Sequence, residues 1–110
     1  MTERFLNKIE DQEIVFSLGD VSWSFHFYSF RGLMYLDLME QDNYIFAGKR
    51  VMSNQWILPN YIAEGIGNFR FETYAADAED YVWYDGFNDK FRLVSYSDEE
   101  IKEMQDKGEE

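Results

Sequence analysis

The sequence contains one histidine, His26, the residue type most often used for general acid–base catalysis. Ser22 and Ser24 lie on the same face of the predicted strand as His26, because side chains alternate along a strand. A catalytic triad, however, needs partners that converge on the histidine, and this spacing alone does not build one. We therefore interpret His26 as a surface or interface residue. We predict that the protein is not an enzyme and has no catalytic residue.

The chain has no cysteine, which excludes disulfides, thiolate metal sites and a cysteine nucleophile. A calcium loop needs oxygen ligands at alternating positions, a glycine at its sharp turn and a closing glutamate. In the most acidic stretch, residues 77–89, frames that start at Asp77, Asp80 or Asp85 each fail at least one requirement. We favour a solvated or partner-facing loop over a divalent cation site, and we predict no metal and no cofactor. The acids of this stretch are Asp77, Glu79, Asp80, Asp85 and Asp89.

The net charge is −12, from 22 acidic and 10 basic residues. Surfaces that bind nucleic acid need clustered bases, and here only Lys49 and Arg50 are adjacent. Gly65-Ile66-Gly67 lacks the strand–loop–helix order and the lysine of a phosphate loop. We predict that no nucleic acid binds. The acidity indicates either a merely soluble surface or one that mimics nucleic acid and captures a basic partner.

Apolar and polar residues alternate along most of the chain from about residue 13, which is typical of strands. Gly19-Asp20 separates the first two runs and predicts a β-hairpin. Arg31-Gly32 and the polar residues 40–43 predict further tight turns and a four-stranded meander. The pattern predicts an all-β fold, a single small barrel or sandwich of about six mainly antiparallel strands with a short C-terminal helix. The predicted strands are 14–18, 21–28, 33–39, 44–51, 69–74 and 91–96.

The two ends of the chain differ from this pattern. Residues 1–10 are compatible with a short helical turn or an extended arm, and they contain no apolar signal-peptide core. Ser97 and Glu100 form a capping-box pattern, which predicts a helix from about Asp98 to Gln105. We predict one domain, residues 1–110, with a β core at about 10–97 and an acidic helix and tail at 98–110. No apolar run approaches membrane-spanning length, so we expect synthesis in a cytoplasm and no membrane partner.

Aromatic residues make up 19% of the chain, more than one small core needs. Several lie outside the alternating runs, where an aromatic side chain either fills the end of the fold or anchors a partner. We predict that at least two of these residues are interface anchors. The candidates are Trp56, Tyr81, Trp83, Tyr84 and Phe87.

The order and spacing of a set of short motifs resembles the phage baseplate plug family of contractile-tailed myophages. The strongest element is Tyr35-Leu36-Asp37-Leu38 followed by Ala47-Gly48-Lys49-Arg50-Val51. Each motif alone is common strand and turn chemistry, and the resemblance covers about residues 10–97. The other motifs are Ser17-Leu18-Gly19-Asp20, Asn43-Tyr44-Ile45-Phe46, Leu58-Pro59-Asn60-Tyr61, Gly67-Asn68-Phe69, Asp85-Gly86-Phe87 and Phe91-Arg92-Leu93-Val94-Ser95-Tyr96.

The resemblance implies a structural protein of the virion, in the baseplate hub near the junction of tail tube and spike. Its implied partners are other baseplate and hub proteins and tail-tube proteins, in a multi-copy assembly around the tail axis. The residues by themselves leave two alternative functions open. One is an acidic DNA mimic that inhibits a host nucleic-acid-binding protein, and the other is a small ligand-binding β-module.

Deleting residues 98–110 should leave the β-domain folded, because the alternating pattern ends at Tyr96 and the tail is mostly charged. Ile101 and Met104 lie three residues apart and can cover one edge of the domain, so a modest loss of stability is expected. Denaturant unfolding of the truncated chain measures this loss. A truncated chain without a cooperative transition would place the helix in the core.

Overall fold

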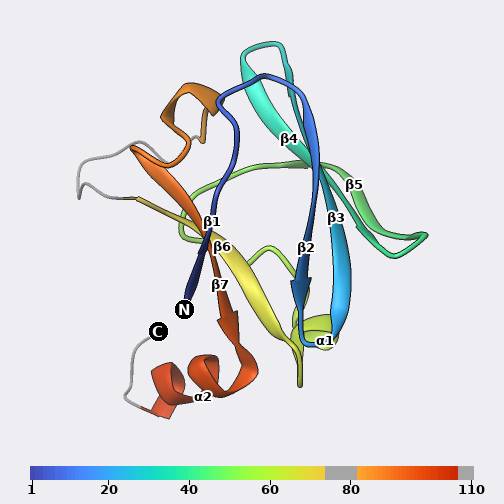
Figure 1. The fold of residues 1–110 in the computed structure, drawn as a ribbon, viewed down its shortest axis with the longest axis vertical. Coiled ribbons are helices and arrows are strands. Elements are labelled where there is room, and N and C mark those ends of the chain that lie inside the picture. The colour runs from blue at the N-terminus through green and yellow to red at the C-terminus, as the bar shows by residue number, and fades with distance from the viewer. Residues whose placement is uncertain (74–81, 107–110) are drawn as a thin grey trace.

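The computed structural model describes residues 1–73 and 82–106 (Figure 1). The described residues form seven strands in two antiparallel sheets, with a C-terminal helix and two short helical turns. This confirms the predicted all-β class. The strands are β1 (Thr2–Arg4), β2 (Gln12–Leu18), β3 (Val21–Phe30), β4 (Leu33–Glu40), β5 (Asn43–Arg50), β6 (Gly67–Thr73) and β7 (Phe91–Ser97). The helical elements are α1 (Asn60–Ala63), the 3-10 turn η1 (Tyr84–Gly86) and α2 (Asp98–Asp106).

One sheet has the strand order β2-β3-β4-β5, so the predicted meander is confirmed. In the β2–β3 turn, Gly19 and Asp20 both have φ of 63°. Two consecutive left-handed residues are the geometry of a type I′ hairpin turn, whose twist matches that of the flanking strands. The register then places Phe16 opposite Trp23 and Phe25 opposite Leu38, all four of them buried.

The other sheet has the order β1-β7-β6, and its first strand comes from the N-terminal arm. Thr2 pairs with Ser95 and Arg4 with Leu93, so the arm is extended and not a helical turn. Leu6 follows with only 1% of its surface exposed. The strand structure therefore begins before the predicted boundary at residue 10. Three residues are too few to show an alternating period, and their pairing partner lies about ninety positions away in the sequence.

The core lies between the two sheets and consists largely of phenylalanine rings. Phe25 of β3 meets Phe69 of β6 edge-on, with ring centroids 4.9 Å apart. Phe27 meets Phe71 in the same way at 5.8 Å. Edge-to-face contacts of this kind add stability beyond the burial of area. The described strands thus form a sandwich-like pair of sheets and not a closed barrel.

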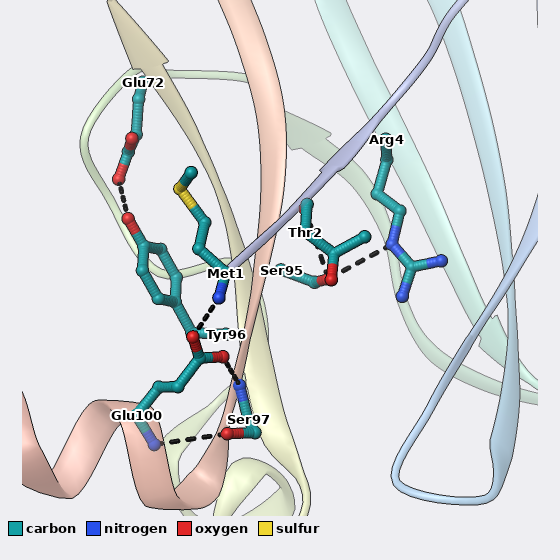
Figure 2. Close-up of polar contacts among 8 residues, drawn as sticks. All are labelled: Met1, Thr2, Arg4, Glu72, Ser95, Tyr96, Ser97 and Glu100. Carbon is teal, nitrogen blue, oxygen red and sulfur yellow. Dashed lines mark hydrogen bonds and ion pairs between the residues drawn. The ribbon is translucent and has the colours of Figure 1, made fainter.

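The predicted capping box of α2 is confirmed (Figure 2). The Glu100 amide donates to Ser97 Oγ at 3.2 Å, and the Ser97 amide donates to Glu100 Oε1 at 2.9 Å. The other carboxylate oxygen of Glu100 forms an ion pair with the amino group of Met1. Because both contacts meet at Glu100, the start of α2 is tied to the start of β1. No residue of α2 is fully buried.

Gly67, at the start of β6, should be the glycine of this region least tolerant of substitution. Its φ is 121°, and an added Cβ would lie 2.3 Å from the backbone oxygen of Tyr96. Gly65 also has a positive φ, 80°, but an added Cβ there meets nothing within 4 Å. We expect Gly65→Ala to cost about 1–2 kcal/mol in unfolding free energy from backbone strain alone. Gly67→Ala should lower the unfolding free energy by clearly more, since the backbone must also shift to make room for the Cβ. Equal costs in denaturant unfolding would contradict this.

Candidate assembly surface

Phe87, a predicted interface residue, lies in the core. Its exposed fraction is 0%, and its ring stacks on Phe71 with centroids 5.8 Å apart and an angle of 13°. The next residue, Asn88, has φ of 69°, and its side chain accepts a hydrogen bond from the Leu6 amide and donates one to the Leu6 carbonyl. This turn directs Phe87 inward. The ring of Phe87 therefore fills the core, and an irregular backbone is no sign that a side chain is exposed.

Trp83 and Tyr84 are half-buried at the end of the sandwich, with ring centroids 4.9 Å apart. The Tyr84 hydroxyl donates to Glu10 Oε1 at 3.2 Å, and Ser29 at the end of β3 donates to the other oxygen at 3.4 Å. Glu10 thus links the loop before β2 to two further segments, which lie together at this end of the molecule (Figure 1). Tyr81, the neighbouring candidate, lies outside the described residues.

Two residues that the sequence analysis did not select, Phe30 and Leu33, flank the β3–β4 turn, and Leu33 lies near Trp83. Phe30, the last residue of β3, is 56% exposed and pairs with Leu33 across the β3–β4 turn. Leu33 and Trp83 line one hollow of about 420 Å³, whose other walls include Met34, Val51 and Arg50. We call Phe30, Leu33, Trp83 and Tyr84 the aromatic end. The alternation of β3 could have identified Phe30, since it shares the outer face with His26 and Tyr28.

Trp56 lies apart from the aromatic end, against the outer face of the β6–β7 pair. The guanidinium carbon of Arg70 lies 4.5 Å from the centroid of the Trp56 ring and 5.2 Å from that of Tyr96. Arg70 also forms an ion pair with Glu72 at 2.9 Å. Trp56 therefore stacks within the chain itself, on a cation that is already paired. The structure does not bring it together with Trp83.

Glu72 is the acceptor at the centre of this outer face. It accepts hydrogen bonds from the Tyr96 hydroxyl (Figure 2), from Arg70 at 2.9 Å and from Arg92 at 3.2 Å. Burial raises the pKa of Glu72, but the hydrogen bonds from Tyr96 and Arg70 and the two positive charges outweigh it, so the pKa is lowered. This carboxylate stays charged and holds the face together. It is not available as a proton donor.

His26 lies on the outer face of the other sheet, between two carboxylates. Its Nε2 is 2.9 Å from Asp11 Oδ1 and its Nδ1 is 3.4 Å from Asp37 Oδ2. Its hydrogen-bond partners are thus one acid in the loop before β2 and one on β4, and not Ser22 or Ser24. This arrangement supplies no nucleophile. Burial lowers the pKa of His26, but the hydrogen bonds and charges of Asp11 and Asp37 outweigh it, and the pKa is raised above 6.5.

Asp37 joins the two motifs that dominate the family resemblance. Its Oδ1 accepts a hydrogen bond from the Gly48 amide at 2.7 Å and another from the Tyr28 hydroxyl at 3.2 Å. Gly48 has φ of 69°, and the register between β4 and β5 shifts on both sides of Leu38. A glycine with positive φ is common where a strand is locally irregular, because other residues are strained there. Asp37 on β4 therefore holds the irregular part of β5 in place.

Two features are absent from the described residues, a metal-ligand cluster and a membrane-spanning helix. Within residues 1–73 and 82–106, no group of three His, Asp or Glu side chains is placed to hold a metal ion. No helix in that part of the chain is long and apolar enough to cross a membrane. Asp77, Glu79 and Asp80 of the acidic stretch lie outside the described residues. Asp89 forms an ion pair with Lys8.

The raised pKa of His26 can be measured directly, because the chain has one histidine and so one set of imidazole signals in a proton NMR titration. We expect a pKa above 6.5, and a lower pKa in Asp11→Asn, which removes the negative charge beside Nε2. Asp20→Asn, which removes an equal charge in the β2–β3 turn, should leave it unchanged. The stabilisation from this cluster is complete below about pH 6.5 and is lost as the pH rises through the folded-state pKa. Equal pKa values in all three proteins would contradict this.

A comparison with protein families agrees with the motif resemblance and extends it to the N-terminal strand. The family model described as cyanophage baseplate Pam3 plug gp18 matches residues 1–98. The match spans both sheets and ends at Asp98, the first residue of α2. No curated protein matches the chain. Because the match covers most of the 110 residues, the chain belongs to the family of the cyanophage baseplate Pam3 plug protein gp18.

Proposed function

We propose that the protein is a structural subunit of a phage contractile-tail baseplate hub, near the junction of tail tube and spike, and that it acts by assembly and not by catalysis. The observation that carries this proposal is the family match over residues 1–98. Its partners are other baseplate and hub proteins and tail-tube proteins, and several copies surround the tail axis. It is synthesised in the host cytoplasm and resides in the virion.

The chemistry of the described residues supports a role without catalysis. The one histidine is held by two carboxylates, and the buried or half-buried acids Asp37 and Glu72 serve as acceptors within the sheets. A general acid or base needs a free position facing a substrate. The hydrogen bonds of these groups instead stabilise the fold.

The aromatic end supports a role in assembly. Aromatic side chains that are partly exposed around a hollow are the usual anchors of protein interfaces. Phe30 offers an exposed ring, and Trp83 forms one wall of the hollow. We assign this surface to contact with a neighbouring baseplate protein, and we exclude Phe87 from it because its ring is inside the chain.

Replacing Trp83 and Tyr84 together by alanine should give a folded protein that fails to join baseplates. Truncation of an interface aromatic commonly costs about 2–4 kcal/mol of binding free energy. In a multi-copy assembly this loss repeats at every contact, so incorporation should fail. Complementation of a phage that lacks the gene, followed by detection of the protein in purified tails, measures incorporation. Thermal unfolding checks that the variant is folded.

Tyr61→Ala is the matched control, since Tyr61 is an aromatic residue with 80% exposure on α1, away from the aromatic end. It should be incorporated normally, and so should His26→Ala. Phe87→Ala should instead unfold more easily by about 3–5 kcal/mol, because it leaves a cavity beneath Phe71. Infectious particles that contain the Trp83 and Tyr84 double variant would exclude this surface. An activity lost with His26 would exclude the role without catalysis.

A further inference from the structure

In the described part of the chain the two sheets have four edge strands, of which β1 is short, β6 is covered and β2 is contacted by a side chain near one end. β1 has only three residues. The segment after β5 covers β6, since the Asn54 amide donates to the Phe71 carbonyl at 2.6 Å and the Ile57 amide to the Phe69 carbonyl at 2.9 Å. On β2, Arg4 donates to the Ser17 carbonyl at 2.8 Å. Covering or shortening edges is how proteins avoid unwanted strand pairing.

The fourth edge, β5, is long and uncovered. It spans eight residues and, among the residues that the structure describes, pairs with β4 alone. Within residues 1–73 and 82–106, no backbone hydrogen bond joins β5 to any other segment. Its residues 44–47, Tyr-Ile-Phe-Ala, carry no charge and no proline, and Tyr44 is 66% exposed. Figure 1 shows β5 at the outer side of its sheet. A bare edge with such residues is a template for another strand.

The charges that flank this edge indicate which kind of strand can pair with it. Glu40 and Asp42 precede the uncharged residues, whereas Lys49 and Arg50 follow them. If two such strands lie antiparallel, the acidic end of each meets the basic end of the other. Opposite charges in facing positions stabilise a strand pair, and like charges oppose it. We propose that β5 pairs antiparallel with β5 of a second copy across a two-fold axis, which joins the two four-stranded sheets into one.

One register satisfies the charges and the side-chain shapes together. It places Phe46 opposite Phe46 of the second copy, on the axis. Tyr44 then lies opposite Gly48, which has no side chain and leaves room for the exposed ring, an arrangement that stabilises glycine in a strand. Asp42 lies opposite Arg50, and the two-fold axis creates this pair twice. The register between β4 and β5 shifts on both sides of Leu38, the partner of Phe46, so the axis falls between the two irregular steps of β5.

This inference does not rest on the baseplate role. The self-pairing edge belongs to β5, whereas the aromatic end is formed by Phe30, Leu33, Trp83 and Tyr84. A monomeric protein that still joins baseplates through the aromatic end would exclude the pairing and leave the role in place. A dimer that never joins baseplates would support the pairing and exclude the baseplate role.

Disulfide cross-linking tests the register, because the natural chain contains no cysteine. Facing residues of an antiparallel pair have Cα atoms about 4.5–5.5 Å apart, a separation that a disulfide spans. With an added oxidant, Phe46→Cys should form the covalent dimer at least about ten-fold faster than Val15→Cys. Val15 is the matched control, since it is an exposed residue of β2, the opposite edge strand of the same sheet. Equal rates would overturn the proposal.

Sedimentation of the cysteine-free chain from micromolar to millimolar concentration is the second measurement. It should show a monomer–dimer equilibrium. Ala47→Lys, which places a charge on an exposed central position of β5, should weaken the dimer at least about ten-fold. Ser17→Lys, the same change on exposed β2, should leave it unchanged. A chain that stays monomeric over this whole concentration range would overturn the proposal. The partner of the β5 edge would then be a strand of another protein. A dimer that Ala47→Lys does not weaken would overturn it as well.

Discussion

The contact between the phenylalanine rings of β3 and β6 is the interaction on which the rest of the structure depends. Phe25 and Phe27 face Phe69 and Phe71 across the gap between the sheets, and all four are fully buried. Phe87 extends this cluster from the loop before β7. Each sheet alone would expose an apolar face, and large buried rings dominate the energy of so small a core.

The outer faces are held by a different kind of interaction, in which a single carboxylate satisfies several donors. Asp37 accepts from Gly48 and Tyr28, and Glu72 accepts from Tyr96, Arg70 and Arg92. A partly buried carboxylate is stable only when such donors surround it. Both networks therefore fix the geometry of strands that the core alone would leave free to slide. Rigid outer faces of this kind suit the proposed role of the subunit in assembly. A surface that is preorganised loses less entropy when it binds a partner.

A subunit that works by assembly needs surfaces of different kinds, and the two surfaces described above differ in what they offer. The aromatic end offers side chains and a hollow, to which we assign the recognition of a partner by shape. The edge of β5 offers backbone hydrogen bonds, which accept almost any strand and take their specificity from the flanking charges. The strong negative charge of the chain opposes association between copies, so the proposed contact between them relies on local complementarity such as that of Asp42 and Arg50.

Local patterns in the sequence determined the strands, the tight turns and the cap of α2. Alternation placed Trp23, Phe25 and Phe27 on one face, and Ser97 with Glu100 marked the helix start, because each of these signals depends on residues only a few positions apart. The family resemblance could likewise be recognised from the sequence, since it lies in the order of such local motifs. Only the tertiary structure decided that residues 2–4 form a strand, that Phe87 points inward while Trp83 stays at the surface, and that Asp37 bonds to Gly48. Those outcomes depend on partners far away in the sequence, and a side chain in an irregular loop carries no periodic signal of the direction in which it points.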